Sequence, residues 1–219
     1  MLPPNSKSTV RVTHITTATV ILEIDGVSFI TDPVVDNAPT EYEITYPTPL
    51  GTPRLFAKFE TGPALGLHQL PIIDAVLLSH EDHTDILNDE GRKLLDGRRV
   101  TTIPDGEDLP NVIYLTGDTV PTPKLSEIRQ RFHAAIAAMN PGEARIPPPG
   151  YETPPQITTK GQDAAKLTRE LGADTTVAVH PESWHHSTQG AEELRAVFEA
   201  EGIADRICWA TPGEKKIIA

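Results

Sequence analysis

Cysteine is nearly absent from this chain of 219 residues, in which Cys208 is the only one. One thiol cannot form an intrachain disulfide, and it cannot supply the thiolates of a cysteine-based zinc finger. The chain also lacks a basic cluster: 31 acidic side chains outweigh 19 basic ones, and the formal net charge is −12. Because surfaces that bind phosphate are basic, nucleic acid and anionic membranes are poor candidates for partners.

Long apolar runs are missing as well. The N-terminal segment MLPPNSKSTV has no apolar region typical of a signal peptide, and no run approaches the roughly 20 residues that span a bilayer. We therefore expect a cytoplasmic protein whose partner is a small-molecule substrate, with homo-oligomer formation left open. The length predicts a single domain over residues 1–219, and the 21 prolines predict long, ordered loops.

The first half of the chain is predicted to be mostly β-structure. Residues 8–35 are dominated by Thr, Val and Ile and predict consecutive strands, with a tight hairpin turn at Asp25 and Gly26. Residues 36–70 predict a long surface loop. The apolar run at 71–79 predicts a strand covered on both faces, and residues 88–95 predict a helix.

In the second half, strand and helix patterns alternate. Strands are predicted at 98–104, 111–118, 175–180 and 206–210, and helices at 124–140, 158–173 and 188–203. The helix at 158–173 is expected to have a Thr cap at its start and to end at Gly172. Prolines make residues 141–156 a loop. Early hairpins followed by alternating strands and helices indicate a layered α/β domain.

Polar side chains that bind metals recur where the predicted strands stop. The segment VLLSHEDHTDILND, residues 76–89, carries His80, Asp82, His83 and Asp85 directly after an apolar strand. Further candidates at strand ends are His14, Asp32, Asp118 and His180, and His185 and His186 follow the last of these.

One histidine at a strand end is most often a turn residue, but the conjunction of several strand ends favours a metal site. Imidazole and carboxylate without thiolate suit Zn²⁺, with Mn²⁺ or Fe²⁺ as alternatives.

Four segments together resemble the metallo-β-lactamase superfamily in order, spacing and context: HITTATVILEIDGVSFITDP, IDAVLLSHEDHTD, NVIYLTGDT and VAVHPESWHHST. The last two are most similar to the branch that contains L-ascorbate-6-phosphate lactonase and related metal-dependent hydrolases. This resemblance implies an αββα sandwich with a site for one or two ions along one edge of the sheets.

The resemblance also assigns roles to single residues. His80 matches the first metal histidine, Asp118 the carboxylate that bridges two ions, and His180 the last metal histidine. Asp32 matches an acid that orients the ligands. Trp184 and His186 match a wall-and-histidine pair that faces the substrate, which makes His186 a candidate catalytic residue.

The first metal motif departs from the family pattern His-x-His-x-Asp-His. With a one-residue slip, His83 and Asp85 take the second histidine and aspartate roles, and the last histidine is replaced by Ile86. Without the slip, Asp82 stands at the second histidine position, so Asp82 stays an alternative ligand to His83.

A second departure is the absence of histidine between His83 and His133. Similar proteins carry another metal histidine in this interval, so part of the central region is expected to be missing. His133 is expected to pack on a helix instead. Three protein ligands still hold a metal, and we expect one ion to bind more weakly than the other, with water, Asp82 or His14 in the vacancy.

These observations predict a lactonase-like, metal-dependent hydrolase. In it, a metal-bound hydroxide would attack a small lactone or ester, with Asp85 orienting the water. The alternative is a non-catalytic or metal-impaired binding or scaffold protein of the same fold, which the missing histidine favours.

Overall fold

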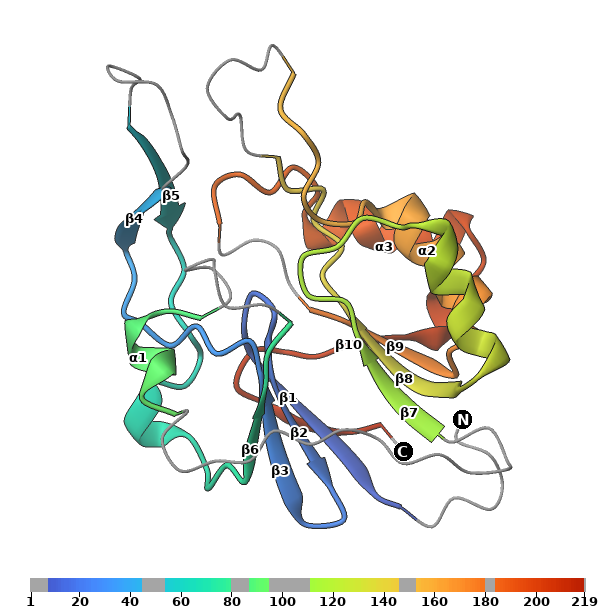
Figure 1. Cartoon of the computed structure of the whole chain (residues 1–219), viewed down its shortest axis with the longest axis horizontal. Helices are drawn as coiled ribbons and strands as arrows, with labels where there is room; N and C mark the ends of the chain where they lie inside the picture. The colour runs from blue at the N-terminus through green and yellow to red at the C-terminus, as the bar shows by residue number, and fades with distance from the viewer. Residues whose placement is uncertain are drawn as a thin grey trace.

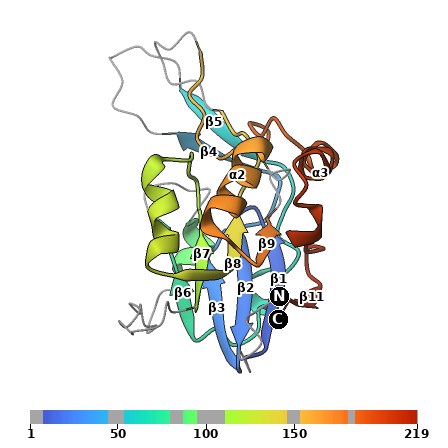
Figure 2. The same ribbon diagram turned by 90° about the vertical axis from the view of Figure 1, so that its right-hand side faces the viewer.

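Two β-sheets packed face to face, with helices beside them, make up most of the structure (Figure 1, Figure 2). This computed structural model describes residues 8–44, 54–79, 87–94, 111–145, 153–179 and 184–218. The architecture is mixed α/β, as the sequence predicts. No helix in these six ranges is long and apolar enough to cross a membrane.

The first sheet has five strands in the order β11-β1-β2-β3-β6. Their bounds are β1 Val10–Thr16, β2 Thr19–Ile24, β3 Val27–Thr31, β6 Ala75–Leu77 and β11 Lys215–Ile217. The predicted hairpin is confirmed, since Ile24 pairs with Val27 across a turn in which Asp25 and Gly26 have φ of 50° and 89°. Positive φ at both central residues is the geometry that suits a two-residue hairpin turn.

β6 is shorter than the predicted strand and lies at one edge of this sheet, parallel to β3. Ala75 and Val76 are buried, but Ile72 just before them is 86% exposed. The apolar run at 71–79 therefore does not form a strand covered along its whole length. Its last part, β6, ends close to Ser79, the last described residue before the polar segment of the sequence.

The second sheet has four parallel strands in the order β10-β9-β8-β7. Their bounds are β7 Asn111–Leu115, β8 His133–Met139, β9 Thr175–Ala178 and β10 Ile207–Trp209. Helices α2 (Gly161–Leu171) and α3 (Ala191–Ala200) lie beside this sheet (Figure 1). Because all four strands run the same way, their carboxyl ends meet at one edge.

The helix predicted at 124–140 is wrong. A 3₁₀-helix, η2 (Pro123–Gln130), is followed by strand β8, so His133 begins a strand and does not lie on a helix. The alanines of HAAIAAM favour helix intrinsically, but this strand is buried between α2 and the first sheet, where tertiary packing overrides propensity.

The loop predicted at 36–70 is also wrong in part. It contains a two-stranded sheet of β4 (Thr40–Ile44) and β5 (Leu55–Phe59), followed by the 3₁₀-helix η1 (Leu67–Gln69). This hairpin projects from one end of the molecule (Figure 1). In β5 the buried Ala57 and Phe59 alternate with the exposed Phe56 and Lys58, but LFAKF lacks the alternation of polar and apolar residues that predicts such a strand.

Smaller differences concern element ends. Helix α1 covers only Asp89–Arg92, with the expected cap at Asn88, and α2 starts after Lys160, which makes no side-chain cap. His14 lies inside β1 and does not follow it. Strand β11 is absent from the prediction, and so is the short 3₁₀-helix η4 (Ala204–Arg206). The strand predicted at 98–104 lies outside the described residues.

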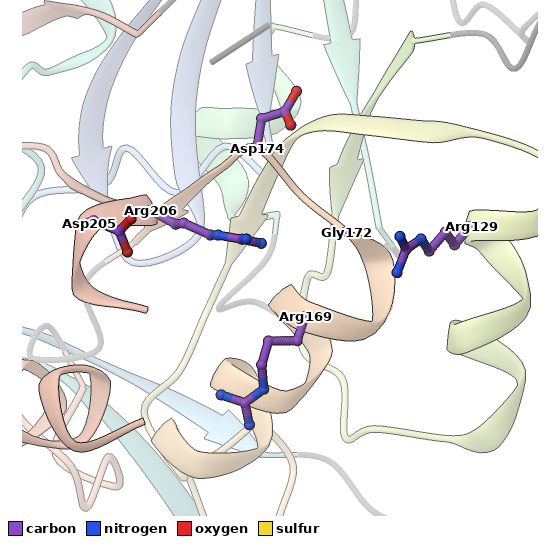
Figure 3. A pocket seen from close by; sticks show the side chains of 6 residues that line it. All are labelled: Arg129, Arg169, Gly172, Asp174, Asp205 and Arg206. Carbon is purple, nitrogen blue, oxygen red and sulfur yellow. The ribbon is translucent and has the colours of Figure 1, made fainter. Parts of the chain in front are cut away.

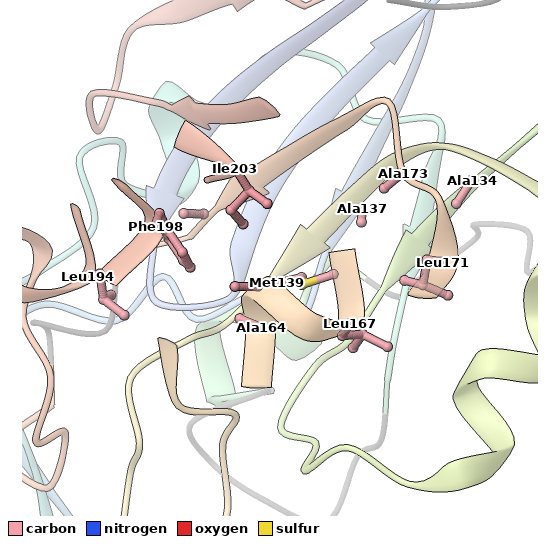
Figure 4. Packing of buried hydrophobic residues seen from close by; sticks show 12 residues of the cluster. Ala134, Ala137, Met139, Ala164, Leu167, Leu171, Ala173, Leu194, Phe198 and Ile203 are labelled. Carbon is pink, nitrogen blue, oxygen red and sulfur yellow. The ribbon is translucent and has the colours of Figure 1, made fainter. Parts of the chain in front are cut away.

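Three apolar layers hold the two large sheets and their helices together, and a fourth cluster around Phe59 and Trp184 packs the β4–β5 hairpin. Val12, Leu22, Ile136 and Val177 represent the layer between the sheets. A second layer fills the space between β8, β9 and the helices α2 and α3, where Met139, Leu167 and Phe198 meet (Figure 4). A third covers the outer face of the first sheet around Ile21, Ile30 and Val76.

Replacing Phe198 on α3 with alanine tests the helix layer. The ring is 1% exposed, so the cavity left behind should lower the free energy of unfolding by about 3–5 kcal/mol. Phe56 on β5 is 43% exposed, and Phe56→Ala is a matched control that should change stability by only about 0.5 kcal/mol. Urea unfolding of the three proteins measures the difference, and equal losses for both variants would contradict this packing.

Candidate functional site

Three chain segments meet where β3, β6 and β7 end. The backbone N–H of Asp32, just after β3, donates to the carbonyl of Leu77 at 2.9 Å, and Asp32 Oδ1 accepts the N–H of Ser79 at 2.7 Å. A Cβ built on Gly117, just after β7, would lie 2.4 Å from Ser79 Cβ and 3.6 Å from Asp32 Oδ2. The ends of the two sheets are therefore in direct contact here.

Asp32 is held in place by its surroundings. It is 2% exposed and has a positive φ of 37°, a conformation that aspartate tolerates better than most residues. Thr19 Oγ1 donates to the Asp32 carbonyl at 2.7 Å and accepts the N–H of Val34 at 2.9 Å. Since a buried carboxylate is costly without hydrogen-bond donors, the N–H of Ser79 supplies a stabilising donor here.

Asp118 follows β7 and lies next to the end of β8. Asn140 Nδ2 donates to Asp118 Oδ1 at 3.1 Å, and the backbone N–H of Asn140 donates to Thr116 Oγ1 at 3.2 Å. Sequence reasoning missed Asn140, because it was placed at the end of a helix that does not form. The available signal was a polar residue directly after an apolar run, the same signal that identified Asp118.

A small cavity of about 10 Å³ lies between the sheets at this edge. Its lining includes Thr31, Asp32, Gly117, Asn140 and Val179. These residues come from the ends of β3, β7, β8 and β9, and Ser79 at the end of β6 touches the same group. Five strands of the two sheets thus end around one point.

Most of the predicted metal ligands lie outside the described residues: His80, Asp82, His83, Asp85 and His180. In the chain, Ser79 directly precedes His80 and Val179 directly precedes His180. Among the residues that the structure describes, no three His, Cys, Asp or Glu side chains gather into a metal-binding group. Whether the predicted ligands lie together therefore stays a prediction.

Trp184 and His186 lie beside the β4–β5 hairpin. Trp184 is 6% exposed, and its ring centroid is 4.9 Å from Phe59 and 5.7 Å from His186. An isolated bridge joins Phe59 to Trp184, and the N–H of Lys58 donates to His185 Nδ1 at 3.0 Å. Main-chain and ring contacts therefore dock the hairpin on the segment from 184 to 186.

Tyr42 of the same hairpin supports this packing. Its ring centroid is 5.9 Å from that of Trp184, and its hydroxyl donates to Asp36 Oδ2 at 2.6 Å. Burial, followed by the hydrogen bond to Asp36, raises the pKa of Tyr42 well above its ordinary value. The phenol is thus a neutral hydrogen-bond donor at physiological pH.

The segment after β8 connects this hairpin region to the strand ends. The carbonyl of Gly142 accepts the N–H groups of Thr188 and Gln189 at 3.0 and 3.1 Å, and the N–H of Arg145 donates to the carbonyl of His186 at 3.1 Å. The segment that begins at Asn140 is therefore hydrogen-bonded to the segment that contains His186.

Two other histidines have structural partners. His14, 1% exposed on β1, places Nε2 3.0 Å from the carbonyl of Thr17. His133 Nε2 lies 2.8 Å from Asp174 Oδ2 where β8 and β9 begin, at the opposite edge of the second sheet. His133 is consequently remote from the strand ends that carry Asp118, although it lies on a strand and not on the helix we expected.

A cleft of about 540 Å³ also lies at this opposite edge (Figure 3). Arg129, Arg169, Asp174, Asp205 and Arg206 line it. Positive and negative side chains alternate there, with Asp174 paired to His133 and Arg169 bonded to Glu201 at 2.9 Å. Two of its ionic groups are thus paired with residues outside the lining, and none of the predicted site residues lies there, so the converging strand ends are the better candidate site.

Comparison with solved structures shows which fold this is. An isothiocyanate hydrolase from Delia radicum gut bacteria superposes with a TM-score of 0.70 and 21% identity, over 94% of this chain and 98% of that one. A possible metal-dependent hydrolase from Veillonella parvula gives 0.66 and 20%, over 96% and 100% of the two chains. A metallo hydrolase from Ignicoccus hospitalis gives 0.62 and 16%, over 96% and 99%.

The chain therefore shares the fold of these hydrolases and spans nearly the whole length of each. No family model matches the sequence, and no curated protein matches it.

Substituting Gly117 with alanine tests the contact between the strand ends. Gly117 and Gly202 both have positive φ, 52° and 68°, but a Cβ at Gly202 would meet nothing within 4 Å. Gly202→Ala should therefore cost about 1–2 kcal/mol of stability from backbone strain alone. Gly117→Ala should cost about 1–3 kcal/mol more, because Ser79 must move. Equal losses in chemical denaturation would show that Gly117 and Ser79 are not in contact.

Proposed function

We propose that this chain is a metal-dependent hydrolase with the αββα sandwich of the metallo-β-lactamase superfamily. Two supports come from the fold: a pair of packed sheets with helices beside them, and the likeness to three hydrolases over nearly their full length. The resemblance of four sequence segments to that superfamily is the third support.

The proposed metal ligands are His80, His83 or Asp82, Asp85, Asp118 and His180. The carrying observation is that Ser79 and Val179, the residues before His80 and His180, reach the same edge as Asp118. Since consecutive Cα atoms are about 3.8 Å apart, the proposal requires both histidines to reach the ion from that edge.

The donor chemistry fits a catalytic ion. Imidazole and carboxylate groups suit Zn²⁺, with Mn²⁺ or Fe²⁺ as alternatives. The lone thiol does not belong to this set, because Cys208 lies on β10 between the sheets and burial raises its pKa. One or two ions fit the proposed ligands, with one position weakened by the missing histidine.

When bound, the ion would act as a Lewis acid and lower the pKa of a water molecule. The chain's own groups would position the reactants. Asp32 fixes the backbone at Ser79, immediately before His80, by its 2.7 Å bond. Asp85 would orient the attacking water, and Trp184 with His186 would contact the substrate on the side of the β4–β5 hairpin.

We propose a small lactone or ester as the substrate. The net charge of −12 disfavours RNA and other polyanions. An isothiocyanate belongs in the same substrate panel, because a structural neighbour is an isothiocyanate hydrolase. The competing function is a metal-impaired binding or scaffold protein of the same fold, supported by the absence of histidine between His83 and Asp118.

Metal content tests the proposal. Purified wild-type protein should retain about one divalent ion per chain after dialysis, because three or more ligands hold an ion firmly. Asp118→Ala should lose most of that metal while keeping its far-ultraviolet circular dichroism. The matched control is Asp174→Ala at the opposite edge, where the carboxylate pairs with His133, and this variant should keep its metal. Elemental analysis of the three proteins measures the result.

Hydrolysis of lactones, esters and isothiocyanates is then assayed with and without added metal. Activity that falls with metal removal and returns on addition supports an enzyme. Metal binding without turnover of any member of the panel would favour the scaffold function. Full metal content in Asp118→Ala would remove Asp118 from the ligand set.

A further inference from the structure

Only the nitrogen of the Asn140 side-chain amide has a hydrogen-bond partner among the described residues. Its Nδ2 donates to Asp118 Oδ1 at 3.1 Å, while its Oδ1 is buried and has no hydrogen-bond partner among the described residues. A carboxylate only accepts hydrogen bonds, so the amide nitrogen, not the oxygen, must face Asp118. The orientation of this amide is therefore determined by Asp118.

The backbone around Asn140 is anchored independently of that amide. Its N–H donates to Thr116 Oγ1 at 3.2 Å, and the N–H of Thr116 donates to the carbonyl of Ala138 at 3.0 Å. Beyond it, Gly142 accepts two backbone N–H groups from the segment at 188–189. The position of residue 140 beside Asp118 thus does not require an asparagine side chain.

An asparagine here works against the stability of the fold. A buried acceptor without a donor is unfavourable, and a small apolar side chain would remove that cost. The one described contact that the amide gains in return is the bond to Asp118. A group that costs stability and contacts a proposed ligand is typical of a functional site.

We propose that Asn140 is a positioning residue that fixes the carboxylate of Asp118 for metal binding. This inference rests on the proposed function and adds a residue to it. By holding Oδ1 of Asp118, the amide restricts rotation of the carboxylate before an ion arrives. Residues that orient a metal ligand in this way commonly change metal affinity by about 10–100-fold when removed.

The test separates metal affinity from stability. Metal-free Asn140→Ala should unfold at the same temperature as metal-free wild type or at a higher one, because the unpaired oxygen is gone. Its dissociation constant for Zn²⁺, measured by competition with a chromophoric chelator, should be weaker by about 10–100-fold. Asn140→Leu, which fills the same space without polar atoms, should behave in the same way.

The matched control is Thr168→Val on α2. Thr168 is fully buried and bonds to the carbonyl of Ala164 and to Thr176 Oγ1, away from the strand ends. It should lose stability and keep its Zn²⁺ affinity. With Co²⁺ as the bound ion, the visible absorption spectrum should change in both Asn140 variants and stay as in wild type in Thr168→Val.

Each outcome has one meaning. Wild-type affinity and an unchanged Co²⁺ spectrum in both Asn140 variants would overturn the positioning role while the proposed metal site stands. A large loss of metal-free stability in both variants would overturn it as well, since Asn140 would then be a structural residue. A wild-type protein that binds neither Zn²⁺ nor Co²⁺ would overturn the proposed function and this inference together.

Discussion

The hydrogen bond from the N–H of Ser79 to the buried carboxylate of Asp32 is the constraint on which the site depends. β3 and β6 are parallel neighbours, and Asp32 joins their ends both by this bond and by its own N–H to Leu77. The positive φ of Asp32 turns the chain so that its side chain can reach Ser79. This bond holds Ser79, at the end of the first sheet, in the position where it contacts Gly117 at the end of the second sheet, so it determines how the ends of the two sheets meet.

Packing of the second sheet follows from small side chains. β8 is buried between α2 and the first sheet, and Ala134, Ala137 and Ala138 allow both neighbours to approach it closely. Asn140 follows this central strand directly and bonds to Asp118 just after the neighbouring β7. The same layer that stabilises the fold therefore determines the position of the polar groups.

Much of this organisation is predictable from the sequence because it is local. The turn at Asp25 and Gly26, the alternation of strands and helices, and polar residues at strand ends all follow from short patterns. The strand at 133–139 is not predictable in this way, because alanine favours helix and only burial on both faces makes the segment a strand. Asn140 was missed for the same reason, since its role depends on which strand lies beside β7. The pairing of β11 with β1 joins distant parts of the chain and involves a short, charged segment.

Direct observation of a bound ion is the most direct test of this account. A crystal of the protein grown with Zn²⁺ and measured across the zinc absorption edge would locate any ordered ion by its anomalous signal. We expect a peak about 2.0–2.2 Å from side-chain atoms of Asp118 and His180, at the edge where β3, β6 and β7 end. A peak at the opposite edge, beside His133 and Asp174, or no ordered ion at all, would contradict it.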